Sequence, residues 1–223
     1  MYSIAIDGPA GAGKSTIAKL VAKKLQFIYV DTGALYRGLA YACLSEGLGK
    51  ENREEVVGVC KKSRIEIAFD ADGTQIVLLN GENVNPFIRT EQVSAMTSGI
   101  SVYPEVREVL LELQRGMAAS HDVVMDGRDI GTNILPHANV KIFLTASVEE
   151  RAKRRYLEQA AKNPAVTMEE IRQDIIERDY RDEHRETAPL KKAEDAVLVD
   201  SSFLSIEEVA EAILEVAAGR GIL

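Results

Sequence analysis

The chain has 223 residues, of which 46% are hydrophobic, and its formal net charge is −8 at pH 7. This length and composition predict a folded globular protein, either one large domain or one domain with an insertion. The acidic balance disfavours binding to bulk nucleic acid, which needs a basic surface, but still allows a local basic pocket for a small anion.

Other features of the composition disfavour a secreted, membrane or metal-centred protein. Cys43 and Cys60 lack C-x-x-C spacing and are expected to stay reduced. The three histidines show no metal-ligand spacing. No signal-peptide pattern is visible, and no apolar run reaches the roughly 18 residues that a membrane helix needs. We therefore expect a cytoplasmic protein.

The first predicted element, Ser3–Asp7, is a short apolar run typical of a buried strand. It leads into Gly8–Thr16, which fits the pattern G-x-x-x-x-G-K-[ST] at every required position, and Ile17–Leu25 then predicts an amphipathic helix. In this context backbone N–H groups and the helix N-terminus bind phosphates. Lys14 would reach the β- and γ-phosphates, and Ser15 would face Mg²⁺. The predicted ATP site comprises Gly8, Pro9, Ala10, Gly11, Ala12, Gly13, Lys14, Ser15 and Thr16.

Four more short apolar runs alternate with helical patterns and predict further parallel strands: Phe27–Asp31, Asp122–Asp126, Val140–Thr145 and Ala196–Asp200. The alternation predicts a three-layer α/β fold with a doubly wound parallel sheet of five strands. Four strands lead into polar or glycine segments: Gly8–Gly13, Thr32-Gly33, Gly127–Thr132 and Ser201-Ser202. Because ligands of such sheets bind beyond the carboxyl ends of the strands, we expect these segments to converge.

A hairpin pattern interrupts this alternation. Ile65–Phe69 alternates with period two, a turn follows, and Thr74–Asn80 forms the expected second strand. We predict an antiparallel insertion at residues 63–97, within a core of residues 1–62 and 98–223. The sequence leaves open whether the insertion is a decorative edge hairpin or a flap over a second substrate.

The arginines are unevenly distributed, because seven of the 15 lie between Arg151 and Arg185. Asn163-Pro164 interrupts the first helix of this region, and Thr167 with Glu170 has the spacing of a capping box at the start of the next. We expect a short helical lid at about residues 151–166. The arginines either form a salt-bridged, solvated helix face or bind phosphates.

The phosphate loop occurs in GTPases, in motor and transport ATPases, and in small-molecule kinases. The N-K-x-D pattern of GTPases is absent from the sequence, and 223 residues leave little room for ATPase coupling machinery. A kinase must exclude water from ATP, which calls for mobile flaps that carry arginines. A kinase for a small acceptor therefore fits best.

Five motifs follow one another along almost the whole chain. They are I-D-G-P-A-G-A-G-K-S-T at Ile6–Thr16, D-T-G-A-L-Y-R at Asp31–Arg37, Y-P-E-V-R at Tyr103–Arg107, D-G-R-D-I-G-T at Asp126–Thr132 and R-D-Y-R-D-E-H-R at Arg178–Arg185. Together they resemble the bacterial cytidylate kinases of the nucleoside monophosphate kinase superfamily. The resemblance implies transfer of phosphate from ATP to CMP and dCMP, with Mg²⁺, in pyrimidine nucleotide metabolism. We expect a monomer that binds neither nucleic acid nor a membrane.

The resemblance also implies roles for single residues. Asp129 would accept a hydrogen bond from the cytosine amino group, and Arg178 with Asp182 would hold the ribose. The resemblance also implies that Arg154 lies near the ATP phosphates. The full implied CMP-binding set is Thr32, Arg37, Ser98, Arg107, Arg128, Asp129, Arg178 and Asp182, and the implied catalytic set is Lys14, Arg128, Arg178 and Arg185.

Two of these roles have structural alternatives. Thr32 could instead be the N-cap of the helix that follows it. Asp126 occupies the strand-end position of a magnesium-binding acid, but it could instead cap the Gly127–Thr132 loop. Two other functions also remain open: a kinase for shikimate or another nucleotide, and a nucleotide-dependent switch without turnover of a small acceptor.

Overall fold

The computed structural model describes residues 1–160 and 165–222. The chain divides into two compact units. The phosphate-loop unit contains Tyr2–Tyr29 and Asp122–Leu223, and the hairpin unit contains Val30–His121 with Met1. The predicted break at Asn163-Pro164, and with it part of the expected lid at 151–166, lies outside the described residues.

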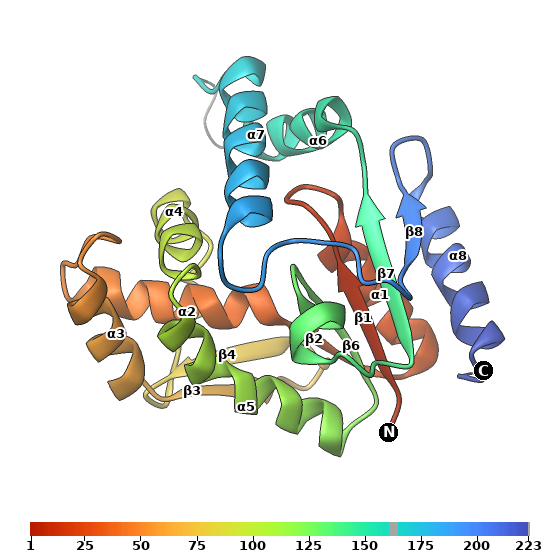
Figure 1. Ribbon diagram of the computed structural model, residues 1–223, viewed down its shortest axis with the longest axis horizontal. Coiled ribbons are helices and arrows are strands. Elements are labelled where there is room, and N and C mark those ends of the chain that lie inside the picture. Colours follow the sequence, from red (N-terminus) through yellow and green to blue (C-terminus); the bar gives the residue numbers. More distant parts are fainter. Residues whose placement is uncertain (161–164, 223) are drawn as a thin grey trace. The chain divides into compact units, whose positions relative to one another are not determined.

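A five-stranded sheet has the order β2 (Ile28–Asp31), β6 (Val123–Gly127), β1 (Ser3–Asp7), β7 (Val140–Thr145) and β8 (Val197–Asp200). The chain passes from one unit to the other within β2. Strand β1 pairs in parallel with β6 and β7, and β7 pairs in parallel with β8 (Figure 1). The five predicted strands are thus confirmed, with ends that differ by at most one residue. The doubly wound α/β fold is confirmed with them.

Helices α1 (Lys14–Leu25) and α8 (Ile206–Gly219) pack on the sheet of the phosphate-loop unit, whereas α6 (Val148–Ala160) and α7 (Met168–His184) pack against each other around Ala152, Ile171 and Ile175. Ile4 and Ile6, on one face of β1, are fully buried in a core that includes Val21 of α1 and Ile213 of α8, and Ala5, on the opposite face, is also fully buried. Successive side chains of a strand point to opposite faces, so a strand covered on both faces is apolar throughout. This explains the continuous apolar runs in the sequence.

The hairpin unit contains helices and a three-stranded antiparallel sheet: α2 (Thr32–Ser45), α3 (Arg53–Lys62), β3 (Ile65–Phe69), β4 (Gln75–Leu79), β5 (Glu82–Asn83), α4 (Glu91–Ile100) and α5 (Pro104–Ser120). The predicted hairpin is confirmed, since Ile65 faces Leu79 across β3 and β4. The third strand, β5, was not predicted. It is too short to show alternation.

The start of α2 corrects one alternative interpretation. Its N-cap is Asp31, whose carboxylate accepts a hydrogen bond from the Ala34 backbone N–H at 2.9 Å. Thr32 is therefore the first helical residue and not the cap. Aspartate and threonine are both good N-caps, so adjacent residues of these types cannot be ranked by local pattern.

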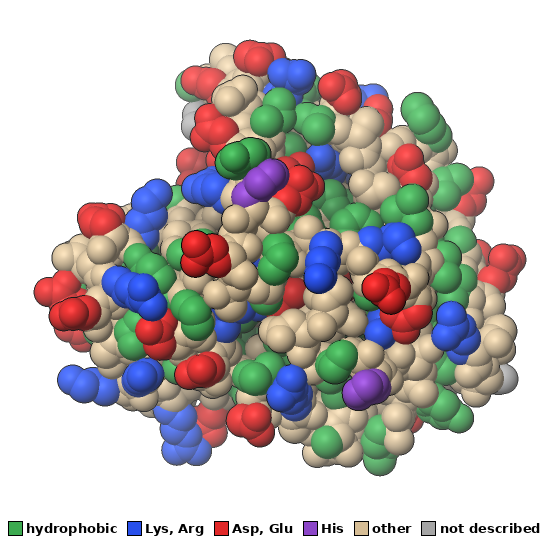
Figure 2. All heavy atoms as spheres, viewed as in Figure 1, with side chains coloured by type: hydrophobic (Ala, Val, Ile, Leu, Met, Phe, Trp, Pro, Cys, Tyr) green, Lys and Arg blue, Asp and Glu red, His purple; other side chains and the backbone are tan. Residues whose placement is uncertain are grey.

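Cys43 and Cys60 are buried in the hairpin unit with their sulfur atoms 3.8 Å apart. This separation is far longer than the roughly 2.05 Å of a disulfide, so both are thiols, as expected. Among the described residues, none of the helices is both long and apolar enough to span a membrane. Figure 2 shows acidic and basic side chains interspersed on the visible face.

Candidate active site

Glycines allow the loop between β1 and α1 to turn where other residues would not fit. Gly8, Gly11 and Gly13 all have positive φ angles. A Cβ atom added to Gly8 would lie 1.9 Å from the backbone oxygen of Leu144 in β7, which is far inside contact distance. The loop can therefore approach the neighbouring strand only with glycine at this position. It ends at the N-terminus of α1, where unpaired backbone N–H groups favour an anion.

Lys14 is a buried cation at the start of α1, and its Nζ donates a 2.6 Å hydrogen bond to the Pro9 carbonyl. Burial and the nearby Arg128 lower the pKa of Lys14 well below its usual value, although Asp126 acts in the opposite direction. A desolvated ammonium group is stabilised by an anionic partner. The site therefore suits phosphate at this position.

Ser15 and Asp126 bring two oxygen groups together beside the phosphate loop. The Ser15 hydroxyl donates to Asp126 Oδ2 at 2.9 Å, and the Tyr29 hydroxyl donates to Asp126 Oδ1 at 2.9 Å. No cluster of three or more possible metal-ligating side chains occurs among residues 1–160 and 165–222. The Ser15–Asp126 pair nevertheless has the hydroxyl and carboxylate oxygens that Mg²⁺ accepts alongside phosphate and water.

Arg128, directly after β6, forms a partly buried ion pair with Asp182 of α7. Their Nε and Oδ2 atoms are 2.9 Å apart. Burial raises the pKa of Asp182, but Arg128, Arg178 and Arg185 outweigh this effect and hold the pKa below its usual value. Asp182 thus stays ionised among cations. Since Asp182 is buried, this part of α7 is not the solvated helix face of the alternative interpretation.

Asp129 lies next to Arg128 and is held from two sides. Arg185, the residue that caps the C-terminus of α7, places Nη2 3.3 Å from Asp129 Oδ1, and both side chains are at most 7% exposed. The Asn133 side chain donates to Asp129 Oδ2 at 3.1 Å. Arg128, Asp129, Asp182 and Arg185, all predicted from one resemblance, are therefore brought together within one unit.

Asp7, which the sequence analysis missed, holds the loop that contains Asp129. Its two carboxylate oxygens accept hydrogen bonds from the backbone N–H groups of Ile130 and Gly131, at 2.8 and 2.7 Å. Burial raises the pKa of Asp7 to about 6. Asp126 was the residue considered as the cap of this loop, but Asp7 makes these two bonds. The only available signal was a carboxylate at the end of a buried strand.

Arg154 and Arg151, both on α6, connect with the phosphate loop in different ways. Arg154 donates to the backbone oxygen of Ser201 at 2.6 Å, and the Ser201 hydroxyl is 3.3 Å from the Ala12 carbonyl. Arg151, given no role at the sequence level, donates directly to the Ala10 carbonyl at 3.0 Å. It also pairs at 2.6 Å with Asp179, one position after Arg178.

The segments that follow β1, β6 and β8 meet in this unit, as predicted, because Ser201 contacts Ala12 and Asp7 contacts Ile130. Thr32-Gly33, by contrast, belongs to the hairpin unit.

The remaining predicted acceptor residues lie in the hairpin unit. Arg37 donates to the Ser94 hydroxyl at 2.6 Å. Arg107 is buried, with its guanidinium carbon 5.5 Å from the centre of the Tyr36 ring, and it donates to the Ser101 carbonyl at 3.4 Å. Neutral groups thus contribute to anchoring both arginines in the hairpin unit.

Ser98 and Thr32 are also buried in this unit. The Ser98 hydroxyl makes no hydrogen bond with the part of the chain that the structure describes. A buried hydroxyl without a partner costs free energy, so such a group invites a ligand or a water molecule.

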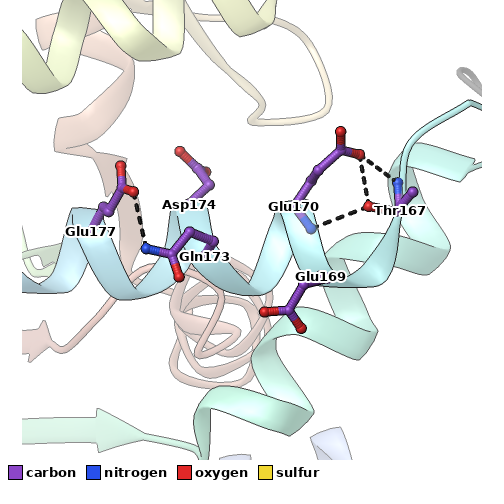
Figure 3. A pocket seen from close by; sticks show the side chains of 6 residues that line it. All are labelled: Thr167, Glu169, Glu170, Gln173, Asp174 and Glu177. Carbon is purple, nitrogen blue, oxygen red and sulfur yellow. Dashed lines mark hydrogen bonds between the residues drawn. The ribbon is translucent and has the colours of Figure 1, made fainter.

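An acidic pocket lies elsewhere, on the N-terminal half of α7. It has a volume of about 550 Å³ and is lined by Thr167, Glu169, Glu170, Gln173, Asp174 and Glu177 (Figure 3). The predicted capping box is confirmed there, because Thr167 and Glu170 bond one another's backbone N–H groups. Four carboxylates would repel phosphate, so this pocket is not the nucleotide site.

Comparison with known proteins agrees with this geometry. The family model described as "Cytidylate kinase" matches residues 4–219. Cytidylate kinases from Geobacillus sp. (strain WCH70) and Bacillus cereus (strain ATCC 10987 / NRS 248) are 48% and 49% identical to the chain over 217 residues. Each alignment covers 97% of this chain and 96% of the relative.

A solved structure is similar in fold alone. The crystal structure of an uncharacterized protein from Eubacterium ventriosum ATCC 27560 has a TM-score of 0.53 at 12% sequence identity, and the match covers 98% of this chain and 99% of that chain. The near-complete family match confirms the resemblance drawn from the five motifs. The chain belongs to the cytidylate kinase family.

Proposed function

We propose that the protein transfers the γ-phosphoryl group of ATP directly to the phosphate of CMP or dCMP, giving ADP and CDP or dCDP. Membership of the cytidylate kinase family makes it a CMP kinase. The observation that supports the chemistry best is the cluster of Arg128, Asp129, Asp182 and Arg185 in the unit that holds the phosphate loop. Arginines suit phosphate, and a carboxylate suits the cytosine amino group.

ATP is proposed to bind through the Gly8–Thr16 loop, with Lys14 on its terminal phosphates and Arg154 nearby. The burial of Lys14 and the bond from Arg154 to Ser201 support these roles. Ser15 and Asp126 are the residues that would hold Mg²⁺, together with phosphate oxygens and water. When bound, Mg²⁺ neutralises charge on the β- and γ-phosphates.

CMP is proposed to contact several residues of the phosphate-loop unit. Arg128 binds its phosphate and Asp129 its cytosine amino group. Arg178 and Asp182 hold the ribose hydroxyls, and Arg185 approaches the transferring phosphate. The low pKa of Asp182 supports this role, because an ionised carboxylate accepts hydrogen bonds from sugar hydroxyls.

Four residues of the hairpin unit are proposed as further CMP contacts: Thr32, Arg37, Ser98 and Arg107. The buried, unpartnered Ser98 hydroxyl supports this assignment. We also propose that residues 63–97 form an inserted subdomain for nucleoside monophosphate binding within a kinase core of residues 1–62 and 98–223. The region at about 151–166 would then act as the lid.

The proposed mechanism needs no covalent nucleophile and no general base. The acceptor is already a phosphate anion, so alignment of the two substrates and neutralisation of charge are what the enzyme must supply. Lys14, Arg128, Arg178 and Arg185 supply that positive charge. We propose that the enzyme acts as a cytoplasmic monomer, without a nucleic-acid or membrane partner.

A coupled assay of ADP release tests this function. CMP, dCMP, UMP and AMP are compared as acceptors at saturating ATP and Mg²⁺. We expect the highest kcat/KM with CMP or dCMP. Preferential turnover of AMP, or no acceleration of ADP release by CMP, would contradict the proposal.

A further inference from the structure

Asp7 joins the end of β1 to the loop that follows β6. It is 4% exposed, and it precedes Gly8, the first residue of the phosphate loop. Its partners, the N–H groups of Ile130 and Gly131, lie 123 and 124 positions later in the chain. Ile130 and Gly131 are the two residues that directly follow Asp129.

These two N–H groups need a partner because they open a short π-helical turn, Ile130–Ile134, of which Asp129 is the N-cap. The first N–H groups of a helix have no acceptor within the helix. The Asp129 side chain makes no cap bond to this turn and instead contacts Arg185 and Asn133. Asp7 thus caps the turn from another strand and leaves the Asp129 carboxylate to face other groups.

The contact is tightly packed as well as charged. A Cβ atom added to Gly131 would lie 3.4 Å from Asp7 Oδ2 and 3.1 Å from Lys141 Cδ. Both Asp7 oxygens are already bonded to backbone N–H groups, and the side chain is buried. This arrangement suits a residue that fixes a loop, not one that meets substrate or metal.

We infer that Asp7 is a positioning residue for base selection: its carboxylate caps the turn after Asp129 and so holds the Asp129 carboxylate where it meets the cytosine amino group. The inference rests on the base-reading role proposed for Asp129. It connects acceptor specificity with the strand that leads into the donor loop.

Asp7→Asn tests the inference in the full-length enzyme. Asparagine keeps the shape, but its NH₂ group cannot accept one of the two N–H bonds. We expect kcat/KM for CMP to fall about tenfold or more, the CMP/UMP ratio of kcat/KM to fall, and KM for ATP to change less than about twofold. Asp122→Asn is the matched control, because Asp122 also accepts a backbone N–H, from Tyr2, at the opposite end of β1. It should behave as wild type.

Gly131→Ala perturbs the same contact from the loop side, and it provides the test if the Asp7→Asn variant does not fold. It should lower the CMP/UMP ratio in the same direction. Unchanged selectivity in a folded Asp7→Asn or Gly131→Ala variant, or an equal loss of ATP and CMP binding, would overturn the positioning role.

Asp129→Ala separates this inference from the proposed function. If Asp129→Ala leaves the CMP/UMP ratio unchanged, the base-reading role fails and the inference fails with it. If Asp129→Ala lowers the ratio while the Asp7 and Gly131 variants keep it, only the inference fails.

Discussion

Arg128 and Asp182 form an ion pair with 2.9 Å between Nε and Oδ2, although 54 positions separate them in the chain. Arg128 comes from the end of β6 and Asp182 from α7. The pair holds in contact the guanidinium and the carboxylate that are proposed to bind the CMP phosphate and ribose. Such preorganisation reduces the entropy that binding costs.

We expect Asp182→Ala to raise KM for CMP by about 10- to 100-fold and to leave KM for ATP nearly unchanged. Loss of a hydrogen bond to a charged group costs about 1.5–3 kcal/mol, which corresponds to this range. Steady-state kinetics with each substrate varied in turn measure the effect. Glu177→Gln is the control, since Glu177 lies on the same helix and faces the acidic pocket. Unchanged acceptor kinetics in Asp182→Ala would mean that the residue is structural.

Lys14→Ala should reduce kcat about 100- to 1000-fold with every acceptor, because the lost charge acts on the donor phosphates. The CMP/UMP ratio should stay near that of wild type. Lys23→Ala, at an exposed position on the same helix, is the control. A change in acceptor preference without a loss of kcat would contradict the role assigned to Lys14.

Asp7 predicts a specific dependence of stability on pH. Burial raises its pKa in the folded protein from the ordinary value of 3.8 to about 6, so the folded state binds the proton more tightly than the unfolded state. The free energy of unfolding should therefore fall as pH rises from about 4 through about 6, and this contribution should level off above roughly pH 7. The change is on the order of 3 kcal/mol. Urea unfolding at pH 4.5, 5.5 and 7 should show a smaller decrease in Asp7→Asn than in wild type.

Gln75 is expected to anchor the inserted sheet in the hairpin unit. Its buried side-chain amide accepts from the Asp31 N–H at 2.9 Å and donates to the Asp31 carbonyl at 3.2 Å. Gln75→Ala would leave two buried backbone groups unpaired, at a cost of about 1–3 kcal/mol each. Urea unfolding should show this loss, while Gln92→Ala at an exposed position of α4 should show almost none. Equal stability of the two variants would contradict the anchoring role.

The parts of the fold that were predicted correctly all have local signals. The phosphate loop needs glycines with positive φ next to a lysine and a hydroxyl, and these occupy one continuous segment. Buried parallel strands produce apolar runs, so β1, β6 and β7 were placed to within one residue. The Thr167–Glu170 capping box depends on residues three apart. By contrast, Asp31 and Thr32 are adjacent and chemically similar, so the true N-cap could not be chosen.

The sequence by itself determined the fold class, the phosphate loop and, through five ordered motifs, the family. Only the tertiary structure decided which charges meet: Arg128 with Asp182, Arg185 with Asp129, and Asp7 with the N–H groups after Asp129. The physical reason is distance along the chain. A capping box or a strand is specified by residues a few positions apart, whereas these contacts join residues more than 50 positions apart. They arise only when the folded chain brings the carboxyl ends of β1 and β6 to the same edge of the sheet and places the C-terminal end of α7 beside the segment that follows β6.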